Sequence, residues 1–282
     1  MKNDIFVLTK IPMEDLIMAD HYNLYSLKHF SGIVADCMDM TLPENFAPSI
    51  NWVSDILKER LGGKADRVVL YHADAVGHYI WQKYTNLFAP VYMYSNMSVP
   101  FLSTVESVTP VAHATMYTGM DPEGHGIKTY DRPKLECTTL FDLWIEQGKK
   151  VAIVAQKDST FLHIFAGRNL DYFEEECGVE VQERALKLIE EDKYDIISIH
   201  TFDYDNAAHA YGPESKQALN AVSLEAEGYM RIAEALIRNA NGRRTLLTYS
   251  PDHGQHLLPG GNGQHGSKMI EDMNIVHFFG TL

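Results

Sequence analysis

The sequence predicts an α/β fold in three layers, a sandwich in which helices cover both faces of a mostly parallel central sheet. Short, almost continuous apolar segments alternate along the chain with segments whose apolar residues recur every three or four positions. The first pattern is typical of strands buried on both sides, and the second of helices that pack against a sheet. With 282 residues, of which 45% are hydrophobic, the chain is long enough to bury such a core in a single domain.

The predicted strands are short apolar runs, several of them rich in β-branched residues. In chain order they cover residues 5–8, 29–35, 67–73, 150–155, 194–199, 244–249 and 274–279. Apolar residues at helical spacing predict helices over residues 49–61, 138–147, 181–191 and 215–238. Ser49 is expected to cap the first of these helices, and Gly62 to end it.

The charge and the cysteines narrow the class of protein. Because 24 Lys and Arg face 38 Asp and Glu, the net charge is −14, and most of the surface should repel nucleic acids and anionic membranes. Three scattered cysteines form neither a disulfide framework nor a metal clip. The sequence shows no signal peptide and no apolar run of membrane-spanning length, so we expect a cytoplasmic protein.

Carboxylate and imidazole side chains follow several predicted strands. Ligands of parallel sheets bind beyond the carboxyl ends of the strands, which lie at one edge. The candidates for this edge are Asp74, Asp205, His209, Asp252, His253 and His265. Asp and His without a thiolate suit Zn²⁺, with Mn²⁺ as the harder alternative. The set is too large for one tetrahedral ion and fits two, the usual arrangement for displacement at phosphorus.

A hydroxyl nucleophile is predicted near the start of a further helix. Thr109 precedes Pro110, and this pair favours an extended residue followed by a helix start. A helix N-terminus attracts phosphate through its free N–H groups, and coordination by a metal would activate the hydroxyl. Two other interpretations stay open, namely that Thr109 is only a helix cap and that Ser107 is the nucleophile.

Five short motifs occur in a fixed order between residues 67 and 280. They are Asp74 after a strand; Thr109-Pro110 with His113, Thr118-Gly119 and Pro122-Glu123-Gly124-His125-Gly126-Ile127; Asp205 and His209 before Tyr211-Gly212-Pro213; Asp252-His253-Gly254; and His265-Gly266. In this order they resemble the alkaline phosphatase superfamily, above all its type I phosphodiesterase/nucleotide pyrophosphatase branch. Residues 67–280 would then form the metallo-phosphoesterase core of a single domain spanning residues 1–282, with residues 1–66 an N-terminal segment of unassigned role.

The resemblance implies an alkaline phosphatase-like fold and a metal-dependent phosphoric ester hydrolase. One divalent metal ion would be held by Asp205, His209 and His265, and the other by Asp74, Asp252, His253 and the Thr109 oxygen. Thr109 would attack phosphorus and form a phospho-threonine intermediate, which water then hydrolyses. The implied cofactors are two Zn²⁺ ions, with Mn²⁺ as the alternative. The implied partner is a small phosphorylated substrate, with no nucleic acid polymer and no membrane, and the oligomeric state is open.

Two positions depart from the family pattern. The diesterase branch has an Asn that holds a phosphoryl oxygen, and this chain has Ala112 at that position. Residues 156–160 resemble a segment of phosphonoacetate hydrolases in which two lysines help to bind the substrate. Lys157 matches the first lysine and Ser159 replaces the second, so Lys157 is a candidate substrate-binding residue.

The substrate stays open among a diester, a nucleotide, a monoester and a phosphonate. Ala112 also motivates an alternative, a non-catalytic relative that binds metal or senses a ligand. A third hypothesis is a purely structural α/β domain, in which Asp252 and His253 form a turn and Asp205 and His209 an exposed pair on one helix.

Overall fold

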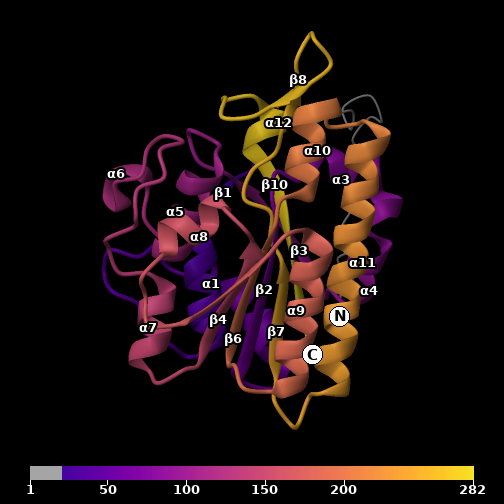
Figure 1. Cartoon of the computed structure of the whole chain (residues 1–282). Helices are drawn as coiled ribbons and strands as arrows, with labels where there is room; N and C mark the ends of the chain where they lie inside the picture. The colour runs from indigo at the N-terminus through magenta and orange to yellow at the C-terminus, as the bar shows by residue number, and fades with distance from the viewer. Residues whose placement is uncertain (1–20) are drawn as a thin grey trace, which may run out of the picture.

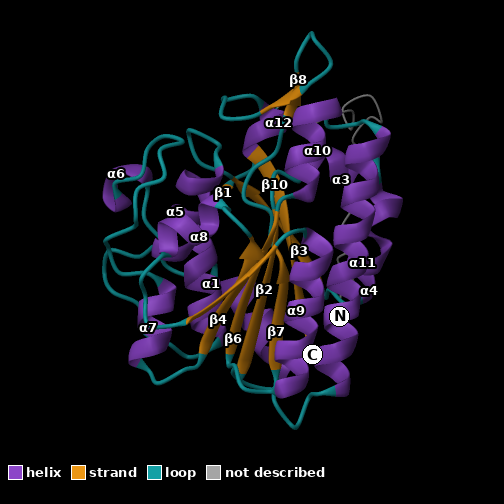
Figure 2. Ribbon diagram, in the orientation of Figure 1, coloured by secondary structure: helices purple, strands orange, loops and turns teal. Residues whose placement is uncertain are grey.

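The computed structural model describes residues 21–282, and the strand predicted at residues 5–8 lies outside this range. An eight-stranded sheet forms the centre, in the order β1-β3-β10-β7-β2-β6-β4-β5. Helices lie on both sides of the sheet (Figure 1), and Figure 2 shows the strands between the two helical layers. The predicted three-layer architecture is therefore confirmed.

Most neighbouring strands of the sheet run parallel, and β10 runs antiparallel to both of its neighbours, β3 and β7. The strands are β1 (Tyr25–Ser26), β2 (Arg67–Ala73), β3 (Met97–Leu102), β4 (Val151–Gln156), β5 (Asp171–Glu175), β6 (Ile196–Thr201), β7 (Thr245–Tyr249) and β10 (Asn274–Thr281). A separate small hairpin pairs β8 (His256–Leu257) with β9 (Gly263–Gln264).

The helices divide between the two faces of the sheet. They are α1 (His29–Cys37), α2 (Asn51–Leu61), α3 (His78–Lys83), the 3₁₀ helix η1 (Thr85–Phe88), α4 (Ala89–Met93), α5 (Thr109–Thr118), α6 (Pro122–His125), α7 (Leu140–Glu146), α8 (Thr160–Phe165), α9 (Gly178–Glu191), α10 (Asp203–Tyr211), α11 (Lys216–Arg238) and α12 (Ile270–Met273). Side chains of β2 alternate between two cores, since Val68 and Leu70 pack with α1, α5 and α7, whereas Val69 and Tyr71 pack with α9 and α11.

The structure corrects two local predictions. Residues 29–35 form helix α1 rather than a strand, and Phe30, Ile33, Val34 and Cys37 are all buried at helical spacing. Helix α2 begins after Ile50 without a side-chain cap, because the Ser49 hydroxyl donates to the Ser54 hydroxyl at 3.0 Å instead.

The sequence patterns also missed strands β1, β3 and β5 of the central sheet. Strand β5 (Asp171–Glu175) lies at the edge of the sheet and is only partly buried, so it lacks the continuous apolar run that identifies a buried strand. The helix end at Gly62, by contrast, is as predicted, since its φ of 69° is left-handed and suits glycine.

The carboxyl ends of β6, β2 and β7 lie side by side, because these three strands are neighbours in the sheet and run parallel. Helix α10 leaves this end directly after β6, and the β8–β9 hairpin lies at the same end of the molecule (Figure 1). The sheet thus brings together segments that are up to about 180 residues apart in the chain. Within residues 21–282, none of the helices combines the length and hydropathy of a membrane span.

We expect Leu70→Ala to lower the free energy of unfolding by about 2–5 kcal/mol, since Leu70 is fully buried on the central strand β2 and truncation leaves a cavity. Leu24→Ala is the matched control, because Leu24 is 93% exposed and its truncation should change stability by less than about 0.5 kcal/mol. Urea unfolding followed by circular dichroism measures both variants. Equal effects of the two variants would contradict the position of β2 in the core.

Candidate metal centre

Each predicted ligand lies where the chain leaves a strand or begins a helix at one end of the sheet. Asp74 directly follows β2, Asp252 and His253 follow β7, and Asp205 and His209 lie one turn apart on α10. His265 directly follows β9. The structure thus brings all six predicted ligands to the carboxyl ends of β2, β6 and β7.

Asp74, Asp252 and His253 form the first of two clusters, with one ligand atom of each within 4.8 Å of the others. The His253 Nε2 lies 3.4 Å from Asp74 Oδ1 and 3.5 Å from Asp252 Oδ2. Thr109, the first residue of α5, donates from its hydroxyl to Asp74 Oδ2 at 3.3 Å, and this hydroxyl is also 3.3 Å from His253 Nε2. The predicted nucleophile therefore faces the first cluster.

Asp205, His209 and His265 form the second cluster under the same 4.8 Å criterion. The Asp205 Oδ1 lies 3.4 Å from His209 Nε2 and 3.6 Å from His265 Nε2. The rings of His253 and His265 stack with their centroids 4.2 Å apart, so the two clusters adjoin.

All three imidazoles are oriented by backbone carbonyls. Nδ1 lies 3.1 Å from Gly254 O in His253, 3.1 Å from Ser107 O in His265 and 3.0 Å from Gly263 O in His209. A carbonyl oxygen accepts only from a protonated Nδ1, so each Nε2 presents a lone pair to its cluster. Burial lowers the pKa of His253 to about 4 and that of His265 to about 3, which keeps both rings neutral at neutral pH.

Among residues 21–282, no Lys or Arg forms an ion pair with Asp74, Asp205 or Asp252. Burial, together with the charges of Asp252 and Asp205, raises the pKa of Asp74, and burial raises the pKa of Asp252 to about 7 against the backbone N–H groups that bind it. Within residues 21–282, Asp74 Oδ1 and Asp252 Oδ2 have no hydrogen-bond partner, although both are buried. Buried carboxylates of this kind are unfavourable without a cation, so the donor set fits divalent metal ions.

Local backbone contacts fix the ligands in place. Asp252 Oδ1 accepts from the backbone N–H of Ala75 at 3.2 Å and of His253 at 3.0 Å, which leaves only Oδ2 free to face the cluster. Gly254 allows a close approach behind them, since a Cβ atom there would lie 2.0 Å from the Glu271 carbonyl oxygen.

Two fully buried histidines lie behind the first cluster, at positions that the sequence did not indicate as ligands. His113 Nε2 is 3.5 Å from Asp252 Oδ2, and His200 Nε2 is 3.3 Å from Asp74 Oδ2. His200 also stacks on Phe161 with ring centroids 5.1 Å apart. These rings restrict the positions of the two carboxylates from the core side.

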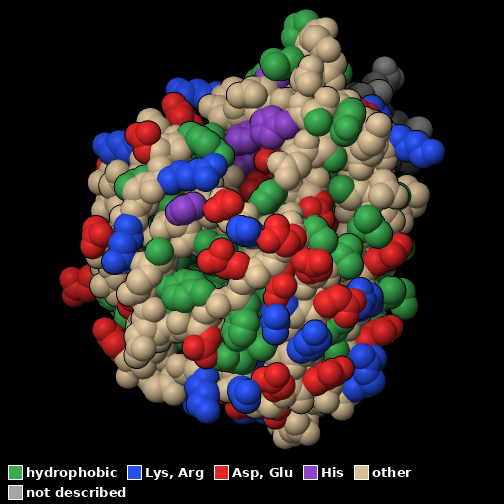
Figure 3. Space-filling model, in the orientation of Figure 1, with side chains coloured by type: hydrophobic (Ala, Val, Ile, Leu, Met, Phe, Trp, Pro, Cys, Tyr) green, Lys and Arg blue, Asp and Glu red, His purple; other side chains and the backbone are tan. Residues whose placement is uncertain are grey.

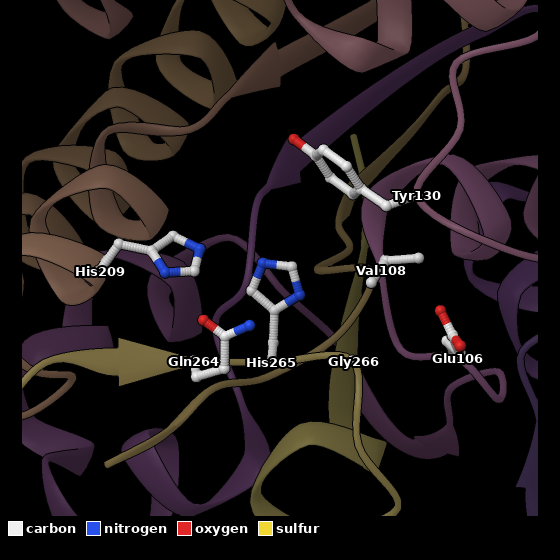
Figure 4. A pocket seen from close by; sticks show the side chains of 7 residues that line it. All are labelled: Glu106, Val108, Tyr130, His209, Gln264, His265 and Gly266. Atoms are coloured by element: carbon white, nitrogen blue, oxygen red, sulfur yellow. The ribbon is translucent and has the colours of Figure 1, made fainter. Parts of the chain in front are cut away.

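Two cavities open onto the clusters and share Tyr130. The first, of about 120 Å³, reaches Asp74, Thr109 and Asp205. The second, of about 450 Å³, is lined by Glu106, Val108, Tyr130, His209, Gln264, His265 and Gly266. Figure 4 shows the His209 and His265 rings beside one another in this second cavity, with Tyr130 on its far side from Gln264. In Figure 3, histidine side chains reach the surface beside acidic side chains on this face.

Three further residues named from the sequence do not direct a free polar side chain to the reacting groups. Lys157 is exposed and pairs with Glu176 at 3.3 Å, and it lines neither of these cavities, so the structure does not bring it to the site. The Ser107 hydroxyl is buried and donates to Ser267 O at 2.9 Å, which favours a structural role. Ala112 is fully buried.

Residues of the loop after α6 were not identified from the sequence, although they line the cavity beside Thr109. Tyr130 and Arg132 belong to this loop, and Asn206 lines the same cavity from α10. The only signal for the loop was its position directly after the His125-Gly126-Ile127 motif.

Solved structures with a similar arrangement support the fold. The chain resembles phosphonoacetate hydrolase from Sinorhizobium meliloti 1021 in complex with phosphonoformate, with 16% identity and a TM-score of 0.50 over 68% of this chain and 56% of that one. It resembles murine ectonucleotide pyrophosphatase / phosphodiesterase 5 with 16% identity and a TM-score of 0.52 over 68% of this chain and 58% of that one. The chain has an alkaline phosphatase-like fold. The resemblance that the motifs predict is thereby confirmed at the level of the fold.

The alignment with a third similar structure includes a larger share of that structure's chain. It is the C-terminal periplasmic domain of phosphoethanolamine transferase EptC from Campylobacter jejuni, with 11% identity and a TM-score of 0.57 over 77% of this chain and 80% of that one. The chain spans little more than half the length of the first two structures. No protein-family model and no curated protein sequence matches it.

We expect purified protein to hold about two divalent metal ions per chain, one for each three-residue cluster, as measured by elemental analysis. Chelation should lower the melting temperature, because a ligand held at about 100 times its dissociation constant stabilises the fold by about 2.7 kcal/mol. Asp205→Ala should lose one ion and keep the other. Asp55→Ala, on the exposed side of α2, is the control and should keep both. Loss of both ions in Asp205→Ala, with the fold intact, would contradict two separable sites.

Proposed function

We propose that this protein is a two-metal phosphoester hydrolase in which Thr109 is the nucleophile. The observation that carries the proposal is the position of the Thr109 hydroxyl, 3.3 Å from both Asp74 Oδ2 and His253 Nε2, in a cavity that also reaches Asp205. A phosphoryl group in this cavity would contact the nucleophile and both ligand clusters together.

The two clusters would hold the metal ions, one on Asp74, Asp252 and His253 beside Thr109, and the other on Asp205, His209 and His265. Zn²⁺ suits these ligands best, with Mn²⁺ as the alternative. When bound, such ions offset the charge of the phosphoryl oxygens and make a hydroxyl or water more acidic.

The residues of the chain divide the reaction between them. Thr109 directs its hydroxyl proton toward Asp74 Oδ2, which leaves an oxygen lone pair free for attack on phosphorus. The bond from Thr109 Oγ1 to phosphorus forms as the bond to the leaving oxygen breaks, and the hydroxyl proton of Thr109 ends on the leaving oxygen, giving a phospho-threonine and the free alcohol. Water then attacks the same phosphorus atom, the bond to Thr109 Oγ1 breaks, and the hydroxyl is restored.

The position of Thr109 restricts its motion and its access to water. Pro110 follows it and fixes the first turn of α5, and Thr109 itself is only 5% exposed. In an in-line displacement the leaving group departs opposite the nucleophile. The 450 Å³ cavity adjoins the second cluster through His209 and His265, and Thr109 is not among the residues that line it, so this cavity is the proposed place for the leaving group.

The names of the similar structures agree with this assignment at the level of chemistry, since they include a phosphonoacetate hydrolase and a nucleotide pyrophosphatase / phosphodiesterase. We extend the proposal to a small phosphorylated or phosphonylated substrate. Residues 67–280 would carry the catalytic core, because every proposed ligand and the nucleophile lie within them.

We expect Thr109→Ala to lower turnover of para-nitrophenyl phosphate or bis-para-nitrophenyl phosphate by at least about 10³-fold, since it removes the atom that bonds to phosphorus. Its metal content should stay at the wild-type level, because each cluster keeps its three Asp and His ligands. Thr109→Ser should retain measurable turnover.

Ser107→Ala tests the alternative that Ser107 is the nucleophile. Its turnover should stay within about threefold of the wild-type rate, because the Ser107 hydroxyl donates to a backbone carbonyl. Turnover in Thr109→Ala near the wild-type rate would exclude the covalent role of Thr109. Metal binding without turnover of any phosphorus ester by the wild type would favour a non-catalytic relative.

A further inference from the structure

The cavity beside Thr109 is lined by one basic side chain, from a loop that the sequence motifs did not indicate. Asp74, Asp158 and Asp205 line it and make it acidic. Of the residues that line it, Arg132 is the single Lys or Arg, and it lies in the loop between α6 and α7. Lys157, the cation that the sequence suggested, lies outside this lining and pairs with Glu176.

Arg132 is held in a way that leaves its charge available. Its Nη2 donates to the Tyr130 hydroxyl at 3.2 Å, and its Nη1 donates to the Asp158 carbonyl oxygen at 3.4 Å. The guanidinium lies 5.5 Å from the centroid of the Tyr130 ring. Among the ion pairs of the described residues, 21–282, Arg132 takes part in none. A guanidinium positioned by neutral partners can still bind an anion at full charge.

Asn206 lines the same cavity with an uncharged amide, whereas the start of α5 offers few donors to a phosphoryl oxygen. Ala112 has no polar side-chain atom and is fully buried. At the start of α5, Pro110 lacks an N–H, and the N–H groups of Val111 and Ala112 already donate to Val108 O at 3.1 and 3.0 Å. The helix start therefore offers fewer free donors than the sequence suggested. Arg132 is the charged donor that the cavity itself provides.

We propose that Arg132 forms an anion subsite beside Thr109 and selects substrates with more negative charge than the single charge of a phosphodiester. The chemical class is a phosphorus compound with two negative charges, either a terminal phosphoryl dianion or a phosphonate with a second acidic group. The proposal rests on the proposed hydrolase function and names its substrate class. A guanidinium binds such oxygens through two parallel N–H donors, and it favours the more highly charged ligand.

Tyr130 gives the subsite a defined boundary. It lines both the 120 Å³ cavity with Arg132 and the 450 Å³ cavity with His209 and His265. Figure 4 shows its ring at the edge of the second cavity, with the hydroxyl directed away from Val108. The anion subsite, in the cavity that Arg132 and Thr109 both line, therefore adjoins the proposed leaving-group cavity at Tyr130.

The test compares two esters that differ in charge. We expect Arg132→Gln to lower kcat/KM for the dianion para-nitrophenyl phosphate by about 10- to 100-fold, the usual effect of losing a charged hydrogen bond. For the monoanion bis-para-nitrophenyl phosphate the loss should stay below about threefold, and Arg132→Lys should recover part of the monoesterase activity. Lys128→Gln, in the same loop and paired with Glu123, is the matched control and should leave both rates unchanged.

Metal content and melting temperature of Arg132→Gln should match the wild type, which shows that the site is intact. Equal losses on both esters would overturn the proposal, because a positioning defect affects both substrates. A larger loss of monoesterase activity in Lys157→Gln than in Arg132→Gln would also overturn it, since the sequence-based choice of cation would then hold.

An equilibrium arm distinguishes failure of the subsite from failure of the hydrolase function. Calorimetry on the metal-loaded protein compares phosphonoacetate with methylphosphonate, and we expect Arg132→Gln to weaken phosphonoacetate binding at least tenfold. If Arg132→Gln weakens the binding of methylphosphonate by the same factor, Arg132 binds the phosphonyl oxygens. If it leaves the binding of methylphosphonate unchanged, Arg132 binds the carboxylate. Unchanged binding of both ligands would overturn the subsite. Absence of turnover in the wild type, with Arg132-dependent binding, would overturn only the hydrolase function.

Discussion

The constraint on which the rest of the site depends is the gathering of three carboxylates, two buried and one half-buried, at one end of the sheet. Asp74, Asp205 and Asp252 lie close together, and within the described part of the chain their charged or ionisable partners are histidines rather than Lys or Arg. Such a cluster destabilises the fold unless positive charge enters from outside. The imidazoles of His209, His253 and His265, each oriented by a carbonyl oxygen at Nδ1, direct Nε2 toward the carboxylates, where a divalent cation could be shared between them.

The sheet topology creates this concentration of charge. Strands β6, β2 and β7 are neighbours and parallel, so the residues that follow them meet although they are far apart in the chain. The antiparallel strand β10 lies beyond β7 and ends the chain away from the ligands, while α5 places Thr109 against the first cluster. Rigid elements thus position the reacting groups, and the loop containing Tyr130 and Arg132 completes the wall around them.

The regular elements of the sheet could be predicted from the sequence better than the loops around the site. Asp74 and Asp252 could be identified because each follows a strand with a clear apolar pattern, at residues 67–73 and 244–249. Helix α1 was mistaken for a strand because a short apolar run carries little information about its period. Strands β1, β3 and β5 were not predicted, because pairing with neighbouring strands stabilises them rather than an apolar pattern of their own.

Arg132 and Lys157 show the limit most clearly. Both are exposed basic residues in loops, and the sequence favours Lys157 because residues 156–160 resemble a segment of phosphonoacetate hydrolases whose lysines help to bind the substrate. In three dimensions the loop after β4 turns Lys157 toward Glu176, whereas Arg132 reaches the cavity from a loop whose sequence carries no periodic signal. In a chain with a net charge of −14, Arg132, which forms no ion pair with the residues that the structure describes and lines the same cavity as Thr109, alters the local potential more than the composition suggests. The framework can therefore be inferred from periodicity, but charge selectivity depends on how irregular segments fold over it, and only the structure shows that.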